Sequence, residues 1–582
     1  MDKISKKIKM IIEKIKKIKK LINNYEIDGY IIPKNDAYFS EFASPDRLKI
    51  ISNFSGSSGF AIILKKENLL FVDGRYTIQA EIESGKYFKI VEIPKILPKE
   101  ILKKFKKKLI LGFDPQLFTK TNLKKLFENT CNLFAIDSNL IDQIYKEKPK
   151  NYVNSFYHLN SKITGESTNQ KINKLIKKIK YNNIDNIFIS ASENVAWLLN
   201  LRGKDSPFSP IPNCKIILTK NKKIFFFSCP KKIGLIKKIN PYNKFQFCKY
   251  SSFLDIIENL PGKNFCIDGS TCSISNENII KSNFNIKNYI DPCYMMKSIK
   301  NSTEIKHMVS SHVKDGLALT KFIYWMKKVN KKKLTELDAQ NKLEKFRKLN
   351  NSYLFPSFNT IAGTGSNGAI VHYRASKESS KIIKNNDIFL CDSGGQYKYG
   401  TTDVTRTICF TKQKSSIKNV FTKVLKGHIA VAVANLNKCN NGKKLDIKAR
   451  QFLKKDGLDY SHGTGHGVGF FLNVHEGPQS ISKYNTIKLQ EGMILSNEPG
   501  YYKKNQYGIR IENLVYVKKY KNKLKFENLT LAPIEKDLIN LNLLNKIEKD
   551  YLFSYHLNIY AKHSQFLNKK EKIWLADFIQ HF

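Results

Sequence analysis

The last third of this chain holds four carboxylates and one histidine, each inside a short segment of strand type or between glycines. The segments are LCDSGGQY, GTTDVTRT, SHGTGHGVG, SNEPGYY and GIRIENLVYV, and the residues are Asp392, Asp403, His466, Glu498 and Glu512. Such oxygen and nitrogen ligands suit hard or borderline divalent cations. Four carboxylates in one cleft could not all stay ionised alone, because like charges raise each other's pKa. The set therefore predicts two dications sharing one site.

Taken singly, each of these residues has a plainer explanation. An Asp in a hairpin is usually a turn or solvated residue, and a Glu on a strand usually lies on the surface. It is much less probable that five such residues, all in apolar strand segments or next to glycines, occur together by chance. We therefore interpret them as one ligand set.

The spacing of the two aspartates supports the same interpretation. IFLCDS and TTDVTRTICF are apolar, β-branched runs joined by a glycine-containing polar stretch, which predicts an antiparallel hairpin. Facing residues of a hairpin have a constant index sum, so Asp392 would face Asp403 across a turn centred between Tyr397 and Lys398. A bulge that shifted the pairing by one residue would still leave the two carboxylates neighbours.

GIRIENLVYV predicts one alternating strand on which Arg510, Glu512 and Leu514 share a face. Arg510 is thereby placed to support a ligating carboxylate. His462 and His466 are four residues apart, a spacing also found in helical zinc motifs, but the glycines at 463, 465 and 467 argue against a helix. The glycine-rich stretches SGSSG, GTGSNG and GTGHGVG lack the context of a phosphate loop and fit tight turns better.

These segments resemble those of aminopeptidase P (Xaa-Pro aminopeptidase), in the pita-bread metallopeptidase superfamily. The resemblance is close over four stretches, SFNTIAGTGSNGAIVHYRA, CDSGGQYKYGTTDVTRT, SHGTGHGVGFFLNVHEGPQ and LSNEPGYY with GIRIENL. It extends upstream to DGYIIPKNDAYFSEFASPDRL, FSGSSGFAII, VDGRYTIQA and SENVAWLLNLRG, and downstream to LTLAPIEKDLI and YLFSYHL. Nearly the whole chain is covered, and no ligand is missing.

The resemblance implies a role for each ligand. Asp392 would bind one metal ion, Asp403 and Glu512 would bridge both, and His466 with Glu498 would bind the second. The metals would be two divalent ions, most commonly Mn2+, with Zn2+ or Co2+ as alternatives. The reaction would be hydrolysis of the N-terminal Xaa-Pro bond of a peptide by a metal-bridging hydroxide.

The resemblance also implies roles for side chains around the metals. Glu498 would be the acid/base partner of the water, and His372 and His475 would hydrogen-bond the peptide carbonyl and its oxyanion. His372, His462, His475 and Arg510 would bind substrate, and His462 with Tyr373 and Phe470 would line a proline pocket. A lone histidine in a glycine-rich loop is otherwise more often packed or solvated than catalytic.

Composition alone would point elsewhere. The net charge of +50 would ordinarily suggest nucleic acid or an anionic membrane. However, only eight of the 100 basic residues are arginine, and Lys, Asn, Ile, Tyr and Phe, which all have A- and T-rich codons, are plentiful. Base composition of the gene explains the charge more simply, so we expect no specific nucleic-acid partner. Five of the eight arginines fall in the segments DGRY, NLRG, HYRA, VTRT and GIRI, where a planar bidentate donor would be required.

The ten cysteines are scattered without a CxxC pair, and no signal peptide is evident, which predicts buried free thiols in a reducing, cytoplasmic compartment. The lysine-rich start has isoleucines at 4, 8, 11, 12, 15 and 18, which predicts an amphipathic helix. We interpret it as the first helix of a globular domain, with a membrane-surface helix as the alternative. No apolar run reaches the length of about 18 residues that a membrane span needs.

Pattern and composition divide the chain into four parts. We expect an α/β module at 1–155, a polar linker (YHLNSKITGESTNQK), a second α/β module at 160–294, a pita-bread α+β catalytic domain at 295–522 and a mostly helical extension at 523–582. The resemblance identifies the two modules as creatinase-like. Both begin with a lysine-rich helix that leads into an Asp-containing turn and a strand, which suggests a duplication. In the catalytic domain, Asn301 would cap a helix, helices would run to about 350, and the ligand-bearing strands would occupy 355–520.

Three other functions remain open: a prolidase, a methionine aminopeptidase, and a non-catalytic pita-bread protein that binds protein or nucleic acid. The two upstream modules and SHGTGHGVGFFLNVHEGP favour aminopeptidase P. Non-catalytic relatives lose their ligands, whereas this chain keeps all five. We also expect a homodimer.

Overall fold

The computed structural model describes residues 2–145, 155–239 and 241–581, and the side chains from residue 9 onward within these ranges. The chain forms two compact units. The first comprises 1–159, 166–207 and 211–293, and the second comprises 160–165, 208–210 and 294–582. The boundaries predicted for the four parts stay a prediction.

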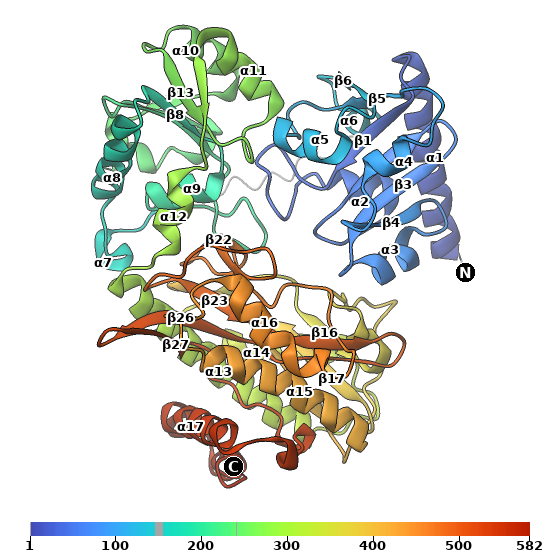
Figure 1. The fold of residues 1–582 in the computed structure, drawn as a ribbon, viewed down its shortest axis with the longest axis vertical. Helices are drawn as coiled ribbons and strands as arrows, with labels where there is room; N and C mark the ends of the chain where they lie inside the picture. Colours follow the sequence, from blue (N-terminus) through green and yellow to red (C-terminus); the bar gives the residue numbers. More distant parts are fainter. Residues whose placement is uncertain (1, 146–154, 240, 582) are drawn as a thin grey trace. The chain divides into compact units, whose positions relative to one another are not determined.

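The first unit opens with a six-stranded sheet in the order β4-β3-β2-β1-β5-β6 (Figure 1). The preceding helix buries Ile11, Ile15, Ile18 and Ile22 in the core of this module, so it is part of the globular fold. Ile4 and Ile8 lie outside the residues whose side chains are described. The elements are α1 (Asp2–Asn24), β1 (Gly29–Pro33), α2 (Arg47–Ser52), β2 (Phe60–Leu64), β3 (Asn68–Asp73), α3 (Thr77–Ser84), β4 (Lys89–Ile93), α4 (Pro98–Leu102), β5 (Ile110–Phe113), α5 (Lys120–Phe127), β6 (Asn132–Ala135) and α6 (Leu140–Ile144).

A second six-stranded sheet has the order β12-β11-β10-β8-β13-β14. The two sheets have the same pairing around one central strand. In the first, β1 pairs antiparallel with β2 and parallel with β5; in the second, β8 pairs antiparallel with β10 and parallel with β13. The shared topology supports the suggested duplication. The elements are α8 (Thr168–Tyr181), β8 (Asn186–Ile189), α9 (Ser192–Leu198), β10 (Lys215–Thr219), β11 (Ile224–Phe227), η1 (Pro230–Lys232), η2 (Ile236–Lys238), η3 (Tyr242–Lys244), β12 (Gln246–Cys248), η4 (Tyr250–Ser252), α10 (Phe253–Glu258), β13 (Asn264–Ile267), α11 (Ile274–Asn283), β14 (Asn285–Asn288) and α12 (Pro292–Ser298).

The stretch predicted as a linker, 157–171, is folded, so that prediction is wrong. It contains β7 (Tyr157–His158), which pairs with β9 (Leu201–Arg202), then α7 (Ser161–Thr164) and the first turn of α8. Ser167 caps α8, and its backbone N–H and hydroxyl both donate to Gln170. Capping residues make a helix start look as polar as a linker.

The second unit contains four small sheets, which bear the predicted ligands. Their orders are β15-β18-β19, β16-β17-β20, β22-β21-β23-β26-β27 and β24-β25. The strands are β15 (Tyr353–Pro356), β16 (Ile361–Thr364), β17 (Ile388–Ser393), β18 (Gly395–Tyr397), β19 (Gly400–Thr401), β20 (Val404–Cys409), β21 (Gly465–Gly467), β22 (Glu476–Ile481), β23 (Ile494–Asn497), β24 (Gly500–Lys503), β25 (Tyr507–Arg510), β26 (Asn513–Tyr520) and β27 (Lys523–Asn528).

Two pairs of helices cover two of these sheets. Apolar residues of α13 (Ser302–Lys328) and α14 (Glu336–Lys348) pack on β16, β17 and β20, and those of α15 (Ser415–Ala432) and α16 (Gly442–Lys454) pack on β23 and β26 (Figure 1). Asn301 caps α13 as predicted, because its Oδ1 accepts from the Glu304 backbone N–H over 3.0 Å. The ligand-bearing strands lie within 355–520, as predicted, and the helices α15 and α16, which were not predicted from the sequence, lie between them.

The C-terminal extension is mostly helical, as predicted. Leu552, Tyr555 and Ile559 lie on the buried face of its main helix and pack in a core shared with α15. The remaining helical elements of the second unit are η5 (Gly365–Ala369), η6 (Lys536–Leu538), η7 (Leu541–Leu543), α17 (Lys546–His563), η8 (Ser564–Phe566) and α18 (Lys569–Ala576).

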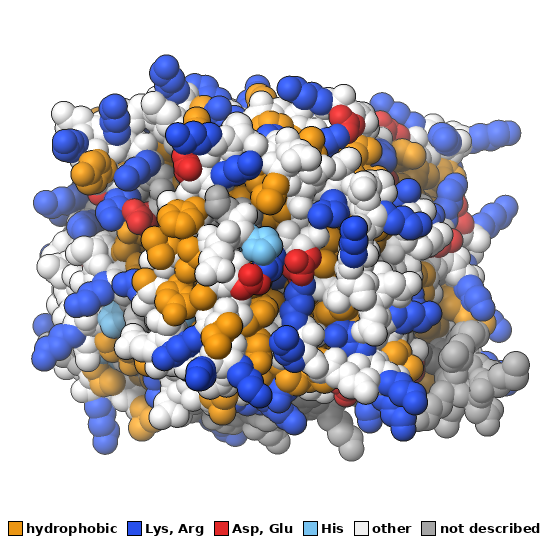
Figure 2. Space-filling view, turned by 90° about the horizontal axis from the view of Figure 1, so that it is seen from below, with side chains coloured by type: hydrophobic (Ala, Val, Ile, Leu, Met, Phe, Trp, Pro, Cys, Tyr) orange, Lys and Arg blue, Asp and Glu red, His pale blue; other side chains and the backbone are white. Residues whose placement is uncertain are grey.

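Three general features complete the fold. All ten cysteines are free thiols, as predicted, but the prediction that they are buried is wrong for Cys229, which is exposed, and Cys439 is half-buried. In the described part of the chain, every helix is too short or too polar to cross a bilayer. On the face shown in Figure 2, Lys and Arg side chains are spread across the surface and do not gather in one stripe.

Candidate metal centre

The hairpin that carries the two aspartates has a different register from the predicted one. Asp392 on β17 pairs with Thr405 on β20, and the turn is centred between Lys398 and Tyr399. The two carboxylates are therefore not directly opposite. Asp403 precedes Thr405 by two residues and shares its face, so it remains a diagonal neighbour of Asp392.

The Asp403 carboxylate is buried among other acidic groups. Burial raises its pKa to about 6, and the charges of Asp392 and Glu498 act in the same direction, while its hydrogen bond with His466 opposes them. A carboxylate in such surroundings is stabilised in its ionised form only by added positive charge.

Glu512 lies where the predicted single strand is interrupted. β25 ends at Arg510 and β26 begins at Asn513 in a different sheet, so the prediction of one continuous strand is wrong. The break lets Glu512 be fastened to β20. Its backbone N–H donates to Thr405 O over 3.2 Å, and Thr405 Oγ1 donates to Glu512 Oε2 over 2.7 Å. Burial raises the Glu512 pKa well above its ordinary value, and the charges of Asp403, Glu498 and Asp392 raise it further.

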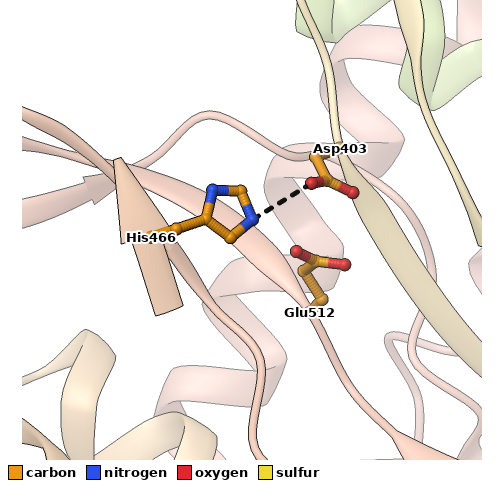
Figure 3. A group of neighbouring side chains, drawn as sticks. All are labelled: Asp403, His466 and Glu512. Carbon is orange, nitrogen blue, oxygen red and sulfur yellow. Dashed lines mark ion pairs between the residues drawn. The ribbon is translucent and has the colours of Figure 1, made fainter. Parts of the chain in front are cut away.

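His466 projects from the short strand β21 towards Asp403 and Glu512 (Figure 3). Its Nε2 lies 3.4 Å from Asp403 Oδ2 and 3.5 Å from Glu498 Oε1, whereas Nδ1 lies 2.9 Å from Gly467 O. Burial by itself would lower the His466 pKa, but the two carboxylates raise it to about 9. A hydrogen bond from Nδ1 to Gly467 O leaves Nε2 as the nitrogen that faces the carboxylates.

Backbone packing brings the strand of His466 against that of Glu498. A Cβ at Gly465 would overlap Ser496 O, so only glycine allows this approach. Ser496 then serves both ligands, because its Oγ accepts from the His466 backbone N–H over 2.9 Å and donates to Glu498 Oε1 over 3.0 Å. Of the three glycines that argued against a helix here, Gly465 and Gly467 are needed for close contact, whereas a Cβ at Gly463 would make only ordinary contacts.

The donor set fits divalent cations. Ligand atoms of Asp403, His466 and Glu512 lie within 4.8 Å of one another. Asp392 Oδ2 accepts from Arg510 Nη2 over 2.5 Å, while Oδ1 is buried and accepts no hydrogen bond in the described part of the chain. A buried carboxylate oxygen in this state is costly unless a cation occupies its lone pairs. Oxygen and imidazole donors with raised carboxylate pKa values are what two hard dications would satisfy.

His462 is joined to the centre by a chain of hydrogen bonds. His462 Nε2 lies 2.8 Å from Tyr502 Oη, and Arg510 Nη1 donates to the same oxygen over 2.6 Å. His462 Nδ1 lies 2.7 Å from Gly463 O, which can only accept, so Nε2 of the neutral ring accepts from the Tyr502 hydroxyl. Arg510 then reaches Asp392, so the predicted support for a ligating carboxylate is present in the geometry.

The other two histidines border the same cluster. The rings of His475 and His466 meet edge to face with centroids 4.4 Å apart. His372 follows Val371, whose carbonyl accepts from Arg510 Nη2 over 3.5 Å. The loop of His372 is held against β25 by glycines, since a Cβ at Gly508 would overlap Gly368 O.

The residues expected in a proline pocket are buried. The Tyr373 hydroxyl donates to Glu336 Oε2 over 2.8 Å, and Phe470 packs in an apolar cluster with Met308 and Leu514.

Sequence reasoning missed Thr405, Tyr502 and Ser496. Thr405 could have been found, because it follows Asp403 by two residues on a strand and must share its face. The other two contacts depend on how separate strands meet.

Comparisons with known proteins cover the whole chain. Residues 14–144 and 147–304 each match a Creatinase/Prolidase N-terminal domain, residues 306–519 match Metallopeptidase family M24, and residues 522–582 match the C-terminal region of peptidase M24. The expected fold class, two creatinase-like modules before a pita-bread catalytic domain, is confirmed.

Similar full-length proteins agree with the family models. A probable Xaa-Pro aminopeptidase P of Laccaria bicolor is 35% identical over 95% of this chain and 91% of its own length, and Xaa-Pro aminopeptidase 1 of Dictyostelium discoideum is 34% identical over 98% and 96%. The crystal structure of an X-prolyl aminopeptidase from Caenorhabditis elegans, described as a cytosolic enzyme with a di-nuclear active site, matches with a TM-score of 0.91 at 30% identity over 98% of this chain and 99% of that one. This chain therefore belongs to the Xaa-Pro aminopeptidases of metallopeptidase family M24.

Proposed function

We propose that this chain removes the N-terminal residue from peptides that have proline in second position, with two divalent cations. The observation that carries the proposal is the largely buried cluster of four carboxylates and one imidazole, in which no described residue donates to Asp392 Oδ1 and the pKa values of Asp403 and Glu512 are raised. The full-length similarity to Xaa-Pro aminopeptidases supports the substrate class.

Five residues would hold the cations. We assign one ion to Asp392, the second to His466 and Glu498, and both to Asp403 and Glu512 as bridging ligands. When bound, two such cations activate water at neutral pH, polarise the scissile carbonyl and bind the free α-amine. We propose Mn2+ as the physiological metal, with Zn2+ and Co2+ as the alternatives.

Proton transfer is assigned to Glu498. Ser496 Oγ donates to Oε1, so we assign the proton to Oε2. Glu498 would take a proton from the attacking water and return it to the proline nitrogen as the bond breaks. That nitrogen belongs to a tertiary amide without N–H, so it must gain a proton to leave as an amine.

Three histidines are assigned to the substrate. His372 and His475 would donate to the carbonyl oxygen, where negative charge develops during attack. His462, held by the Tyr502 hydroxyl, would contact the rigid proline ring. Arg510 would keep both Asp392 and Tyr502 in place and thereby orient the metal site and the proline site together.

The decisive experiment compares an Xaa-Pro-Xaa tripeptide with an Xaa-Pro dipeptide as substrates, using chelated enzyme before and after Mn2+ is restored. We expect cleavage of the tripeptide only, and only with metal. Asp403→Ala is the control for contaminating peptidases. Faster cleavage of the dipeptide would instead show a prolidase. If the metal-loaded protein cleaves neither peptide, the remaining interpretation is a non-catalytic binding protein.

We also propose a homodimer that works in the cytoplasm. Free thiols at all ten cysteines fit a reducing compartment. The solved Caenorhabditis elegans relative is described as cytosolic. Light scattering on the purified protein tests the dimer, and fractionation of cells tests the compartment. A monomer at micromolar concentration, or recovery in a membrane fraction, would contradict these proposals.

A further inference from the structure

Arg406 is a fully buried cation whose hydrogen-bond partners are all uncharged. Six acceptors lie 2.6–3.0 Å from its nitrogens and share the five N–H groups, namely Glu512 O, Thr405 O, Asn513 Oδ1, Ala532 O, Pro533 O and Tyr555 Oη. Among the described residues, no carboxylate oxygen accepts from it. A buried charge without a paired ion costs several kcal/mol, so its retention calls for an explanation.

The position of Arg406 in the fold explains why this buried charge is retained. It lies on β20, three residues after Asp403, and Nη1 donates to the backbone carbonyl of Glu512 over 2.6 Å. Nη2 donates to the side chain of Asn513, the next residue. The guanidinium therefore holds the backbone where the chain passes from β25 to β26. The position of this backbone sets the direction of the Glu512 carboxylate, which faces the acidic cluster.

The other half of the guanidinium is held by the C-terminal extension. Pro533 O and Ala532 O accept from Nε and Nη2, and the Tyr555 hydroxyl on α17 accepts from Nη2 over 3.0 Å. Tyr555 Oη also lies 3.0 Å from Thr530 O, to which its hydroxyl can donate. The extension thus completes the cage around a residue that touches the backbone of a metal ligand.

Resting on the proposed function, we infer that Tyr555 is a positioning residue of the metal centre and that it acts through Arg406. The Tyr555 hydroxyl fixes the guanidinium, and the guanidinium fixes the carbonyl of Glu512. The extension is then a structural requirement for tight metal binding, beyond any contribution to the stability of the fold.

The test compares Tyr555→Phe with Tyr551→Phe. Tyr551 lies one turn earlier on α17, and its ring is nearly parallel to that of Tyr555 with centroids 6.1 Å apart, but its hydroxyl bonds Asn528 and not Arg406. Both variants lose one hydroxyl from the same helix. Mn2+ affinity of the chelated full-length protein is measured by calorimetry, with thermal unfolding of the metal-free forms beside it.

We expect Tyr555→Phe to weaken Mn2+ binding about tenfold, the lower end of the effect of removing partners behind metal ligands. Tyr551→Phe should stay within about twofold of wild type, the ordinary scatter of a distant change. Equal Mn2+ affinities for the two variants would overturn the inference, whatever their melting temperatures.

A second variant tests whether Tyr555 acts through Arg406. Arg406→Lys keeps the charge but cannot reach both Glu512 O and the Tyr555 hydroxyl with a planar fork. Tyr555→Phe should therefore weaken Mn2+ binding little further when Arg406→Lys is already present. Losses that multiply independently would show that Tyr555 acts by another route and would overturn the inference. Asp403→Ala is the reference: if it binds Mn2+ like wild type, the proposed metal site itself is wrong.

Discussion

Arg510 donates to Asp392 across 2.5 Å in the buried interior of the catalytic unit. The contact fixes one carboxylate oxygen, while the other, Oδ1, is buried and accepts no hydrogen bond from the described residues. The Tyr502 hydroxyl holds the opposite side of the same guanidinium. One arginine therefore sets the orientation of a metal-binding residue and of the tyrosine that contacts His462.

Replacing a bridging carboxylate should abolish activity without unfolding the protein. Asp403→Ala or Glu512→Ala removes one ligand shared by both cations and leaves the cations poorly neutralised. Metal content by mass spectrometry, circular dichroism and tripeptide hydrolysis are measured together. Near wild-type hydrolysis by Asp403→Ala in metal-replete buffer would contradict the dinuclear assignment.

Arg510→Lys should lower kcat/KM about 10- to 100-fold and weaken metal binding, because lysine cannot serve Asp392 and Tyr502 at once. Tyr502→Phe keeps the arginine on Asp392 and should raise KM while leaving metal content unchanged. Steady-state kinetics with metal analysis separate the two effects. Loss of metal from Tyr502→Phe would show that the two contacts are not separable in this way.

His475→Ala should leave metal content near wild type and lower kcat by roughly 10²–10³-fold, the scale of one lost oxyanion donor. The ring lies beside that of His466, with centroids 4.4 Å apart, so a metal-binding role is the alternative to be tested. Metal lost from the purified variant would make His475 a ligand. An unchanged kcat would make it a packing residue.

Acid stability should depend on Glu476. This buried carboxylate lies 2.5 Å from Lys300 Nζ and 3.4 Å from Lys297 Nζ. Burial alone would raise the Glu476 pKa, but the two lysines hold it below its ordinary value. Its contribution to the free energy of unfolding is therefore fully present above the unfolded pKa of about 4.3 and is lost as pH falls through the folded value.

Glu476→Gln leaves two buried lysines without their counterion and should cost about 3–5 kcal/mol near neutral pH. The difference in unfolding free energy between wild type and this variant should then shrink as pH falls below about 4.3. Urea denaturation at several pH values measures it. Lys348→Met, at an exposed position on α14, is the control for loss of one charge. A pH-independent difference would contradict the assignment.

Nucleic-acid binding should be weak and should disappear at ordinary salt, because the positive charge is spread along the chain and, on the face shown in Figure 2, is not gathered in one stripe. Such binding comes from the release of counterions and not from base recognition. A gel-shift assay with several unrelated duplexes at 0.05 M and 0.2 M salt gives the answer. Sub-micromolar, sequence-selective binding at the higher salt would reverse this view.

Much of the catalytic unit is predictable from local patterns. Apolar β-branched runs at IFLCDS and VTRTIC form strands, and Asn301 with Glu304 forms the cap of α13. These features depend on residues close in sequence, where propensity and side-chain periodicity operate. The helices α15 and α16, which lie between the ligand-bearing strands, are not among the predicted elements.

Longer-range relationships set the details of the site. Asp392 pairs two residues away from its predicted partner, because the turn of the hairpin is centred one residue later, between Lys398 and Tyr399. The strand of Glu512 is interrupted because β25 pairs with β24 and β26 pairs with β23. Arg406 meets Tyr555 from 149 positions away. A local sequence pattern does not predict contacts between residues that are so far apart in the chain.

The contact between Gly368 and Gly508 limits how far this sequence can drift. The chain has 92 lysines, which fits a gene rich in A and T. Most surface positions tolerate the substitutions that such a base composition favours. Any first- or second-base change in a glycine codon adds at least a Cβ, and at 508 that atom would overlap the neighbouring carbonyl. Mutational bias is therefore blocked at position 508, and we expect this glycine to be retained in relatives whose overall composition has diverged.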